Sequence, residues 1–289
     1  MAFHKAGSGE ISVLTLNLHC FQEDQPFEKL GIIAEALLEL EPDVVALQEC
    51  AQDRWAPERL RVTPGVSIRE GNAALWLVER LRAGGQASHG VWDWAHYGWD
   101  RWEEGCAVLS PHRLRYADSR YVSQSTGPGA WKSRKPVGAF VEVAGFGPVA
   151  VFSTHLGWWG DKEEPFEDSL DRLVTWQAEF LSSVPRSVPV PLLTVGDFNQ
   201  QAGGEGYRFI KDWTGWDDAW LTAHPEGTSG ATIGPNTDGW EGTAEAQRID
   251  YVFTRPEDGL KVVQCERVFT EDDFGRVSDH VGLWTVLGR

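Results

Sequence analysis

Short apolar runs bounded by turn residues recur along the whole chain, and they restrict the folds open to it. Near the start these runs alternate with helical patterns, and further along strand follows strand directly. Each sheet must bury a face against another layer, so this order is typical of an α+β fold with a four-layer α/β/β/α arrangement. We therefore expect two packed mixed β-sheets with helices on their outer faces.

The predicted elements follow from hydrophobic periodicity and from the turn residues between the runs. Helices are expected at 26–40, 72–82 and 165–184. Strands are expected at 11–20, 43–50, 106–110, 119–124, 137–143, 149–156, 192–199, 248–255, 261–269 and 281–287. We find no internal repeat and no long linker, so residues 1–289 are expected to form one domain.

The net charge of −17 arises from 26 Lys and Arg against 43 Asp and Glu. Such a surface repels polyanions and offers no broad basic footprint, which counts against nucleic acid or an anionic membrane as the partner. The argument is limited because a bound divalent cation can supply local positive charge. The short basic segment 131–135, which contains Lys132 and Arg134, can also grip one phosphate.

Cysteine usage and the first residues indicate the expected compartment. The four cysteines show no C-x-x-C spacing, so we expect reduced thiols and no thiolate zinc site. The sequence shows neither an apolar run of signal-peptide type nor a window long enough to span a membrane. A cytoplasmic protein is the expectation, and the oligomeric state is left open.

Polar side chains of a narrow kind stand at the ends of the apolar strands. They are Asn17, His19, Glu49, His155, Asp197, Asn199, Asp250, Asp279 and His280. Each residue alone could be a helix cap, a turn residue or a hydrogen-bonded structural histidine. Strand ends along one sheet edge converge in space, however, so together they predict a single polar site.

The donor atoms of this set favour a hard cation. Carboxylates of Glu49, Asp197 and Asp279, with amide oxygens of Asn17 and Asn199, suit Mg²⁺, Mn²⁺ or Ca²⁺. The sequence contains no H-E-x-x-H motif and no cysteine cluster, which argues against a zinc enzyme. The histidines then become candidates for proton transfer or for stabilising charge.

The segments "QE", "THL", "GDFN", "RIDYVF" and "SDH", in this order, resemble the endonuclease/exonuclease/phosphatase superfamily over nearly the whole chain. That superfamily includes deoxyribonucleases, abasic-site endonucleases, neutral sphingomyelinases and inositol polyphosphate phosphatases. The resemblance implies a four-layer α/β/β/α sandwich. It also implies metal-dependent hydrolysis of a phosphate ester.

The resemblance assigns expected roles by position. Glu49 would be the principal metal ligand, supported by Asn17 and Asp279. Asp197 and Asn199 would contact the attacking water or the phosphate, and with His280 they would hold a second ion where one is used. His280 would also assist at the phosphate, oriented by Asp250, and His155 is the remaining implied catalytic residue.

Two positions distinguish branches of the superfamily. His155 matches the deoxyribonuclease, sphingomyelinase and phosphatase branches, whereas abasic endonucleases usually place tyrosine there. The abasic branch also favours Asn-x-Asp, but here His19 follows Asn17 by two residues, which counts against abasic-site repair. His19 is expected to contact substrate or to lie just outside the metal site.

Two tryptophan-containing loops bear on the substrate. Trp158 and Trp159 follow His155, and Trp240 precedes Asp250, each beside acidic residues. Flat indole faces beside carboxylates suit a polyhydroxylated ligand, although many tryptophans simply pack in a core. The segments "LGWW", "EEPF" and "DGWE" also resemble those of a bacterial branch that includes maltose 6′-phosphate phosphatases.

The sequence therefore favours a phosphomonoesterase that acts on a sugar phosphate or a similar small metabolite. The alternative is a phosphodiesterase of sphingomyelinase or nuclease type, since acidic nucleases occur in the superfamily. A binding protein without catalysis is disfavoured because the set of site residues is intact.

Overall fold

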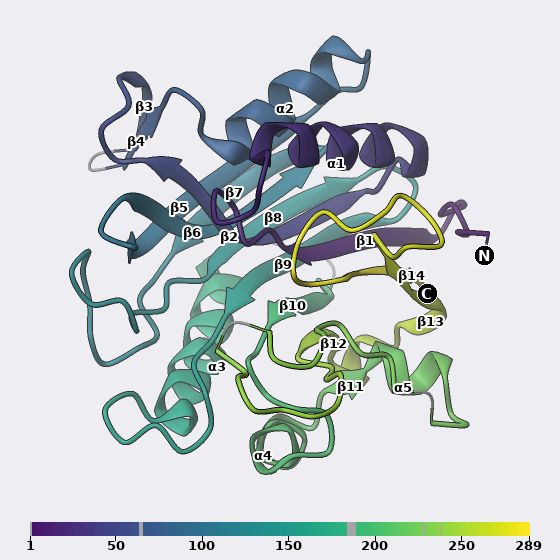
Figure 1. Cartoon of the computed structure of the whole chain (residues 1–289). Helices are drawn as coiled ribbons and strands as arrows, with labels where there is room; N and C mark the ends of the chain where they lie inside the picture. The colour runs from purple at the N-terminus through teal and green to yellow at the C-terminus, as the bar shows by residue number, and fades with distance from the viewer. Residues whose placement is uncertain (1, 64–65, 184–188, 228, 238) are drawn as a thin grey trace.

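The computed structural model describes residues 2–63, 66–183, 189–227, 229–237 and 239–289. Val184, where the third predicted helix ends, and Asp238, in the second tryptophan loop, lie outside the described residues. Two six-stranded sheets dominate the structure and pack face to face (Figure 1).

The first sheet has the strand order β13-β14-β1-β2-β6-β5. Its strands are Glu10–Asn17 (β1), Val44–Asp53 (β2), His89–Gly98 (β5), Trp102–Ser110 (β6), Lys261–Val268 (β13) and Gly282–Gly288 (β14). β1 and β2 are parallel, and the other neighbours in this sheet are antiparallel. Helix α1, Pro26–Leu40, provides the crossover that a parallel pair requires.

The second sheet repeats this plan, with the order β11-β12-β10-β9-β8-β7. Its strands are Arg113–Ser119 (β7), Val137–Val143 (β8), Gly147–His155 (β9), Leu192–Asp197 (β10), Asp217–Asp218 (β11) and Asp250–Thr254 (β12). β9 and β10 form its parallel pair, joined by α3, Phe166–Ser183. A separate hairpin consists of Glu58–Thr63 (β3) and Val66–Arg69 (β4).

Helices cover the outer face of each sheet (Figure 1). α1 and α2 (Ala73–Ala83) pack on the first sheet, and α3 and α4 (Glu205–Thr214) pack on the second. The remaining helical segments are α5 (Ala219–Ala223) and a short 3₁₀ helix, η1 (Pro256–Asp258). The predicted four-layer α/β/β/α sandwich is confirmed.

The middle layer of the core explains why the central strands are apolar on both faces. Residues from both sheets meet there, including Val13, Ala46, Val151, Val195 and Leu283, and all are almost fully buried. Strands covered on both faces read as continuous hydrophobic runs rather than as alternating ones. The same apolar runs that identified the strands therefore hold the two sheets together.

Several details differ from the sequence prediction. The expected strand 119–124 is wrong, because β7 ends at Ser119 and the next residues enter a loop in which Val122 N donates to Arg134 O. The second strand does not stop at Cys50 but continues to Asp53. Periodicity also missed β3, β4, β5, β7, β11, α4 and α5, which are short, polar or exposed on one side.

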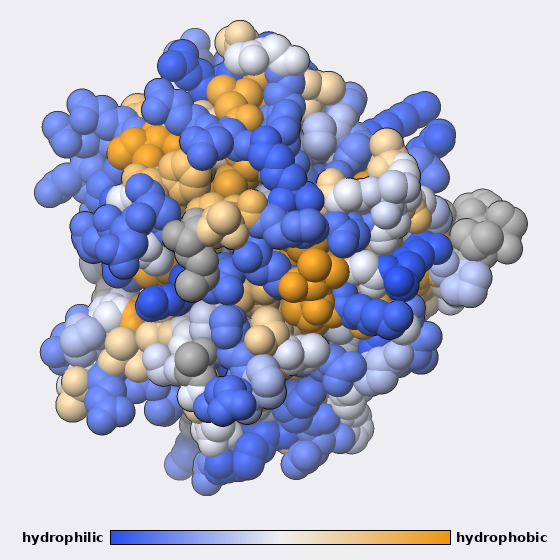
Figure 2. Space-filling model, turned by 90° about the vertical axis from the view of Figure 1, so that its right-hand side faces the viewer, coloured by the Kyte–Doolittle hydropathy of each residue, from blue (hydrophilic) through white to orange (hydrophobic). Residues whose placement is uncertain are grey.

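The face drawn in Figure 2 is mostly hydrophilic, with one hydrophobic area in its upper part and a smaller group near its centre. Within the described ranges, no helix combines the length and the apolar character needed to cross a membrane.

The inter-sheet layer leads to a stability prediction. Leu283→Ala should lower the free energy of unfolding by about 2–5 kcal/mol, because truncating a fully buried leucine leaves a cavity. Val263→Ala on neighbouring β13, where the side chain is 47% exposed, should cost less than about 1 kcal/mol. Urea unfolding followed by tryptophan fluorescence measures both. Equal losses would contradict the placement of the core between the sheets.

Candidate active site

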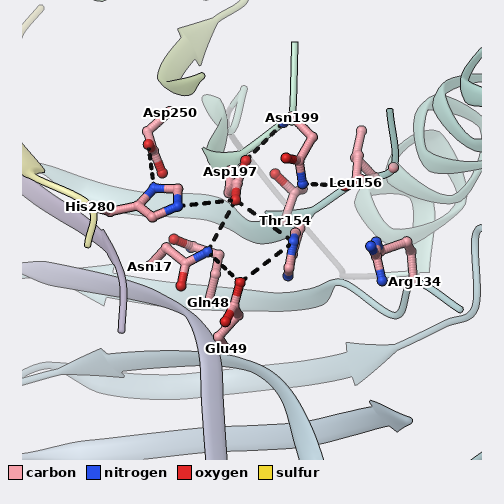
Figure 3. Close-up of polar contacts among 12 residues, drawn as sticks. Asn17, Gln48, Glu49, Arg134, Thr154, Leu156, Asp197, Asn199, Asp250 and His280 are labelled. Carbon is pink, nitrogen blue, oxygen red and sulfur yellow. Dashed lines mark hydrogen bonds and ion pairs between the residues drawn. The ribbon is translucent and has the colours of Figure 1, made fainter. Parts of the chain in front are cut away.

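The site forms where the carboxyl ends of the two parallel strand pairs face each other. Asn17 ends β1 in the first sheet, and His155 and Asp197 end β9 and β10 in the second. Asn17 Nδ2 donates a hydrogen bond of 3.0 Å to Asp197 Oδ2 across the sheets (Figure 3). Strand ends at such crossovers are common ligand sites in α/β proteins.

Glu49 reaches this point through a β-bulge. The pairing of β2 with β6 shifts between Leu47 and Cys50, and Glu49 has a left-handed φ of 45°. A bulge re-aims a side chain, here into the site, where Glu49 Oε1 accepts a 2.8 Å hydrogen bond from Asn17 Nδ2. Such backbone strain is typical of functional positions.

A glycine allows Asp197 to approach the first sheet closely. Gly196 has a φ of 130°, and a Cβ atom there would lie 2.2 Å from Thr154 O on the neighbouring strand and 2.8 Å from Gln48 Nε2 of the first sheet. Asp197 Oδ1 accepts from Asn199 N at 2.8 Å, and Asn199 Nδ2 donates to Leu156 O at 3.0 Å. The segment after β10 is thus fixed by its own polar side chains.

Two histidines flank Asp197. His280 Nδ1 lies 2.8 Å from Asp250 Oδ2, and its Nε2 lies 3.9 Å from Asp197 Oδ2. His155 Nε2 lies 3.7 Å from the same oxygen and 4.0 Å from Glu49 Oε1. A carboxylate on one ring nitrogen orients the imidazole so that its other nitrogen faces the site.

The electrostatics of the site show excess negative charge. Burial, reinforced by Glu104, raises the pKa of Glu49 to about 8, and burial with Asp250 raises the pKa of Asp197 to about 7. Among the described residues, no Lys or Arg lies within 4.0 Å of either carboxylate. The His280 imidazolium, 3.9 Å from Asp197, offsets part of the cost of holding these carboxylates together, and a divalent cation would relieve the rest.

The histidines respond in opposite directions. Burial opposes a charged imidazole, but Asp250 and Asp197 outweigh it and raise the pKa of His280 to about 10. Burial and the Arg134 guanidinium hold the pKa of His155 well below its usual range. The two rings therefore carry different charges near neutral pH.

The donor atoms fit a cation. Ligand atoms of Glu49, His155 and Asp197 lie within 4.8 Å of one another. Asp279 lies 3.6 Å from His19 Nδ1 through its Oδ1, and it is close enough to Glu49 to help raise the pKa of that carboxyl. The amide oxygen of Asn17 accepts from His19 N, so Asn17 turns its nitrogen toward the carboxylates.

The site lies in a cleft with a volume of about 630 Å³. The cleft brings together most of the predicted residues: His19, Glu49, Arg134, His155, Trp158, Asp197, Asn199, Trp240, Asp279 and His280. Asn17 and Asp250 stand behind this lining, hydrogen-bonded to residues that form it. Trp240 Nε1 donates to Asn199 Oδ1 at 3.3 Å, which ties the second tryptophan loop to the site.

Two predicted substrate-binding residues do not line the cleft. Trp159 packs on Phe166 and Phe209, and its Nε1 donates to Glu205. Lys132 lies between the carboxylates of Asp161 and Glu163, at 2.7 and 3.0 Å. Each has local partners that sequence reasoning could not foresee.

Sequence reasoning missed one wall of the cleft. This wall comes from β5, β6 and the loop before β8, and its residues are His96, Tyr97, Trp99, Glu104 and Trp131. The polar start of β6, "WEEG", was the available signal, because it directly precedes a predicted apolar strand. β5, which pairs with β6, was not predicted because polar residues interrupt its apolar pattern.

Within the described part of the chain, three cleft-lining residues carry a buried polar atom without a hydrogen-bond partner. These atoms are His19 Nε2, Arg134 Nε and Trp158 Nε1. Arg134 is only 4% exposed and lies 5.5 Å from the Trp158 ring centroid. Buried donors normally have acceptors, so the cleft suits a ligand rich in oxygen.

Comparison with known proteins agrees with this geometry. A sequence model described as the Endonuclease/Exonuclease/phosphatase family matches residues 14–280. No functionally curated protein shows a significant sequence match to the chain. A family protein from Leptotrichia buccalis C-1013-b superimposes with a TM-score of 0.81 at 25% identity, covering 96% of this chain and 100% of that one.

Two more distant structures share the fold. A mannosyl-6-phosphatase from Bacteroides thetaiotaomicron VPI-5482 has a TM-score of 0.65 at 17% identity, covering 96% of this chain and 100% of that one. D. rerio TDP2, in complex with a single-strand DNA product, has a TM-score of 0.63 at 13% identity, covering 97% and 99%.

The layered fold and the acidic cleft at its strand ends define a protein of the phosphoesterase type. The chain belongs to the endonuclease/exonuclease/phosphatase family, as its sequence motifs predicted. Members of this family are generally phosphoesterase hydrolases.

The charge imbalance predicts cation binding. Mn²⁺ or Mg²⁺ should raise the unfolding temperature, because the ion binds the folded site and offsets the repulsion around Glu49 and Asp197. Glu49→Gln should weaken Mn²⁺ binding in calorimetry by about tenfold or more. Mutating even a residue that only hydrogen-bonds to a metal ligand typically lowers metal affinity by about tenfold or more. Glu142→Gln, at an exposed position of β8, is the control. Equal affinity in the two variants would rule out Glu49 as a ligand.

Proposed function

We propose that this protein is a divalent-metal-dependent phosphoesterase, and that its preferred substrates are phosphomonoesters of sugars or similar small metabolites. The observation that carries the proposal is the cleft itself. Among the described residues, the Glu49 and Asp197 carboxylates have no Lys or Arg within 4.0 Å, and the buried N–H groups of Arg134 Nε and Trp158 Nε1 have no acceptor. A cation would pair with the carboxylates, and a phosphate group would accept hydrogen bonds from the N–H groups.

Glu49 and Asp197 would hold the cation, with His155, Asn199, Asp279 or a turned Asn17 amide completing its ligands. When bound there, it would neutralise phosphate oxygens and the charge that develops during hydrolysis. Asp197, fixed by hydrogen bonds from Asn17 and Asn199, would orient the attacking water and accept its proton.

The remaining residues would bind the phosphoryl group. His280, held by Asp250, has its Nε2 beside Asp197 and would donate to a phosphoryl oxygen. Arg134 would donate from its guanidinium to another oxygen, where a planar fork matches phosphate. His155 lies between the two carboxylates and would hold the water or a phosphoryl oxygen in place.

The choice of a small monoester follows from charge and shape. Carboxylates of Glu49, Glu104, Asp197, Glu241 and Asp279 line the cleft, and Arg134 is the one Lys or Arg among the described residues of that lining. Such a rim repels a nucleic-acid backbone but admits one phosphate paired with a cation. A mannosyl-6-phosphatase with the same fold is compatible with this choice, although at 17% identity it supports the fold alone.

A phosphodiesterase is the second candidate function. TDP2, in complex with a DNA product, shows that this fold accommodates nucleic acid in another protein. The cleft here is open and lined by aromatic residues, which would also accept a diester with a small group on each side.

A substrate panel tests the proposal. Phosphate release from hexose phosphates and p-nitrophenyl phosphate should require Mg²⁺ or Mn²⁺ and stop with a chelator. Asp197→Asn should lower kcat by about 100- to 10,000-fold, because it removes the proton acceptor. Asp212→Asn, on the exposed face of α4, should leave kcat unchanged.

The panel includes bis(p-nitrophenyl) phosphate, phosphocholine-containing diesters and single-stranded DNA. Turnover of diesters without turnover of monoesters would replace the proposed substrate class and leave the metal site standing. Activity that persists after chelation, or in Asp197→Asn, would refute the proposed mechanism.

A further inference from the structure

Glu104 and His96 form a buried pair that the proposed hydrolysis does not use. They face each other across β5 and β6, at a bulge where the pairing shifts between Trp94 and His96. Both side chains are 8% exposed, and both residues line the cleft. A buried ionisable pair in a ligand cleft requires a physical explanation.

Hydrogen bonds on both sides fix the His96 ring. Its Nδ1 lies 3.1 Å from the carbonyl oxygen of Ser133, which can only accept, so Nδ1 carries a hydrogen. Its Nε2 lies 3.2 Å from Glu104 Oε1. Neither nitrogen is left for a ligand, and His96 instead sets the position of the Glu104 carboxylate.

Glu104 has acceptor capacity to spare. A carboxylate offers about four lone-pair sites, yet among the described residues only His96 lies within hydrogen-bond or ion-pair distance of it. Gly98 allows the backbone to approach the other oxygen without a side chain between them, because a Cβ atom at that position would lie 2.6 Å from Glu104 Oε2. Burying a carboxylate with so few donors is costly unless a ligand supplies them.

The position of Glu104 indicates which part of a substrate would meet it. Its negative charge lies near enough to Glu49 and Arg134 to favour a higher pKa for both groups. It does not belong to any group of closely spaced metal-ligating atoms among the described residues. Glu104 therefore adjoins the phosphate position without joining the cation site, as a contact to the esterified alcohol would.

We propose that Glu104, positioned by His96, accepts hydrogen bonds from hydroxyl groups on the alcohol part of the substrate, and so selects polyhydroxylated phosphomonoesters over simple alkyl or aryl ones. This inference rests on the proposed function. The flat rings of Tyr97, Trp131 and Trp158 line the same cleft and suit the C–H faces of a sugar. The volume of about 630 Å³ leaves room for an alcohol beyond the phosphate.

A quaternary ammonium group is the competing occupant, since carboxylates and aromatic rings also bind such cations. It donates no hydrogen bond, however, and would leave the spare acceptors of Glu104 unmet. The Arg134 guanidinium also lies 5.5 Å from the centroid of Trp158, so that ring already has a cation beside it. The structure therefore favours a hydroxyl donor.

The test compares kcat/KM for a hexose 6-phosphate and for p-nitrophenyl phosphate, whose alcohol carries no further hydroxyl. In Glu104→Gln the ratio of hexose to aryl substrate should fall by about tenfold or more, chiefly through KM for the hexose phosphate. His96→Gln should shift the same ratio in the same direction, because it releases the carboxylate. Glu103→Gln is the matched control, since its neighbours are Gln52 and Arg69, outside the cleft.

An unchanged ratio in Glu104→Gln would overturn the inference, as would an equal loss on phosphocholine. If the variant does not fold, wild-type protein with hexose phosphates lacking single hydroxyls replaces it. Loss of about tenfold in kcat/KM for one such analogue supports the inference, and no loss for any of them refutes it.

Failure of the proposed function gives a different result. In that case wild-type protein hydrolyses no phosphomonoester at all. Calorimetric titration of the hexose phosphate into wild type and Glu104→Gln then decides the inference separately. Weaker binding of the hexose phosphate to Glu104→Gln than to wild type would support the inference about Glu104. Equal binding to both proteins, or no binding to either, would reject it.

Discussion

The amide of Asn17, which donates to both Glu49 and Asp197, is the contact on which the site depends. It joins carboxylates from two different sheets at 2.8 and 3.0 Å. To place them there, the fold needs a parallel pair in each sheet, a bulge at Glu49 and a glycine at position 196. The sandwich architecture and the site geometry thus have the same origin.

The convergence of acidic groups at the site lowers the stability of the fold. Burial and neighbouring carboxylates disfavour the charged forms of Glu49 and Asp197, so the fold gives up stability that a bound cation can restore. Among the described residues, the buried N–H groups of Arg134 and Trp158 lack acceptors, and Glu104 has His96 as its one close donor. A ligand that carries both phosphate oxygens and hydroxyl groups would supply acceptors for these N–H groups and donors for Glu104.

Much of the fold was predictable from the sequence, because the central strands are buried on both faces. The ranges 26–40 and 137–143 match α1 and β8 at both ends. β5 was missed because Asp93 and His96 interrupt its apolar residues, and their partners, Lys135 and Glu104, come from other strands or loops. Periodicity contains no information about such long-range polar pairs.

The site was predictable only in part, for the same reason. Residues at strand ends, such as Asn17, His155 and Asp197, could be grouped because strand ends converge. The bulge at Glu49 could not be foreseen, since a local change in strand pairing leaves no pattern in the sequence. Lys132 and Trp159 failed to reach the cleft because nearby carboxylates hold them elsewhere.

The most direct test of the account is anomalous X-ray scattering from crystals grown with Mn²⁺. The account predicts one strong peak between the sheets, within about 2.5 Å of a Glu49 oxygen and beside Asp197. A peak confined to the group of His19, Glu23 and Asp279, or no ordered peak at saturating Mn²⁺, would contradict it.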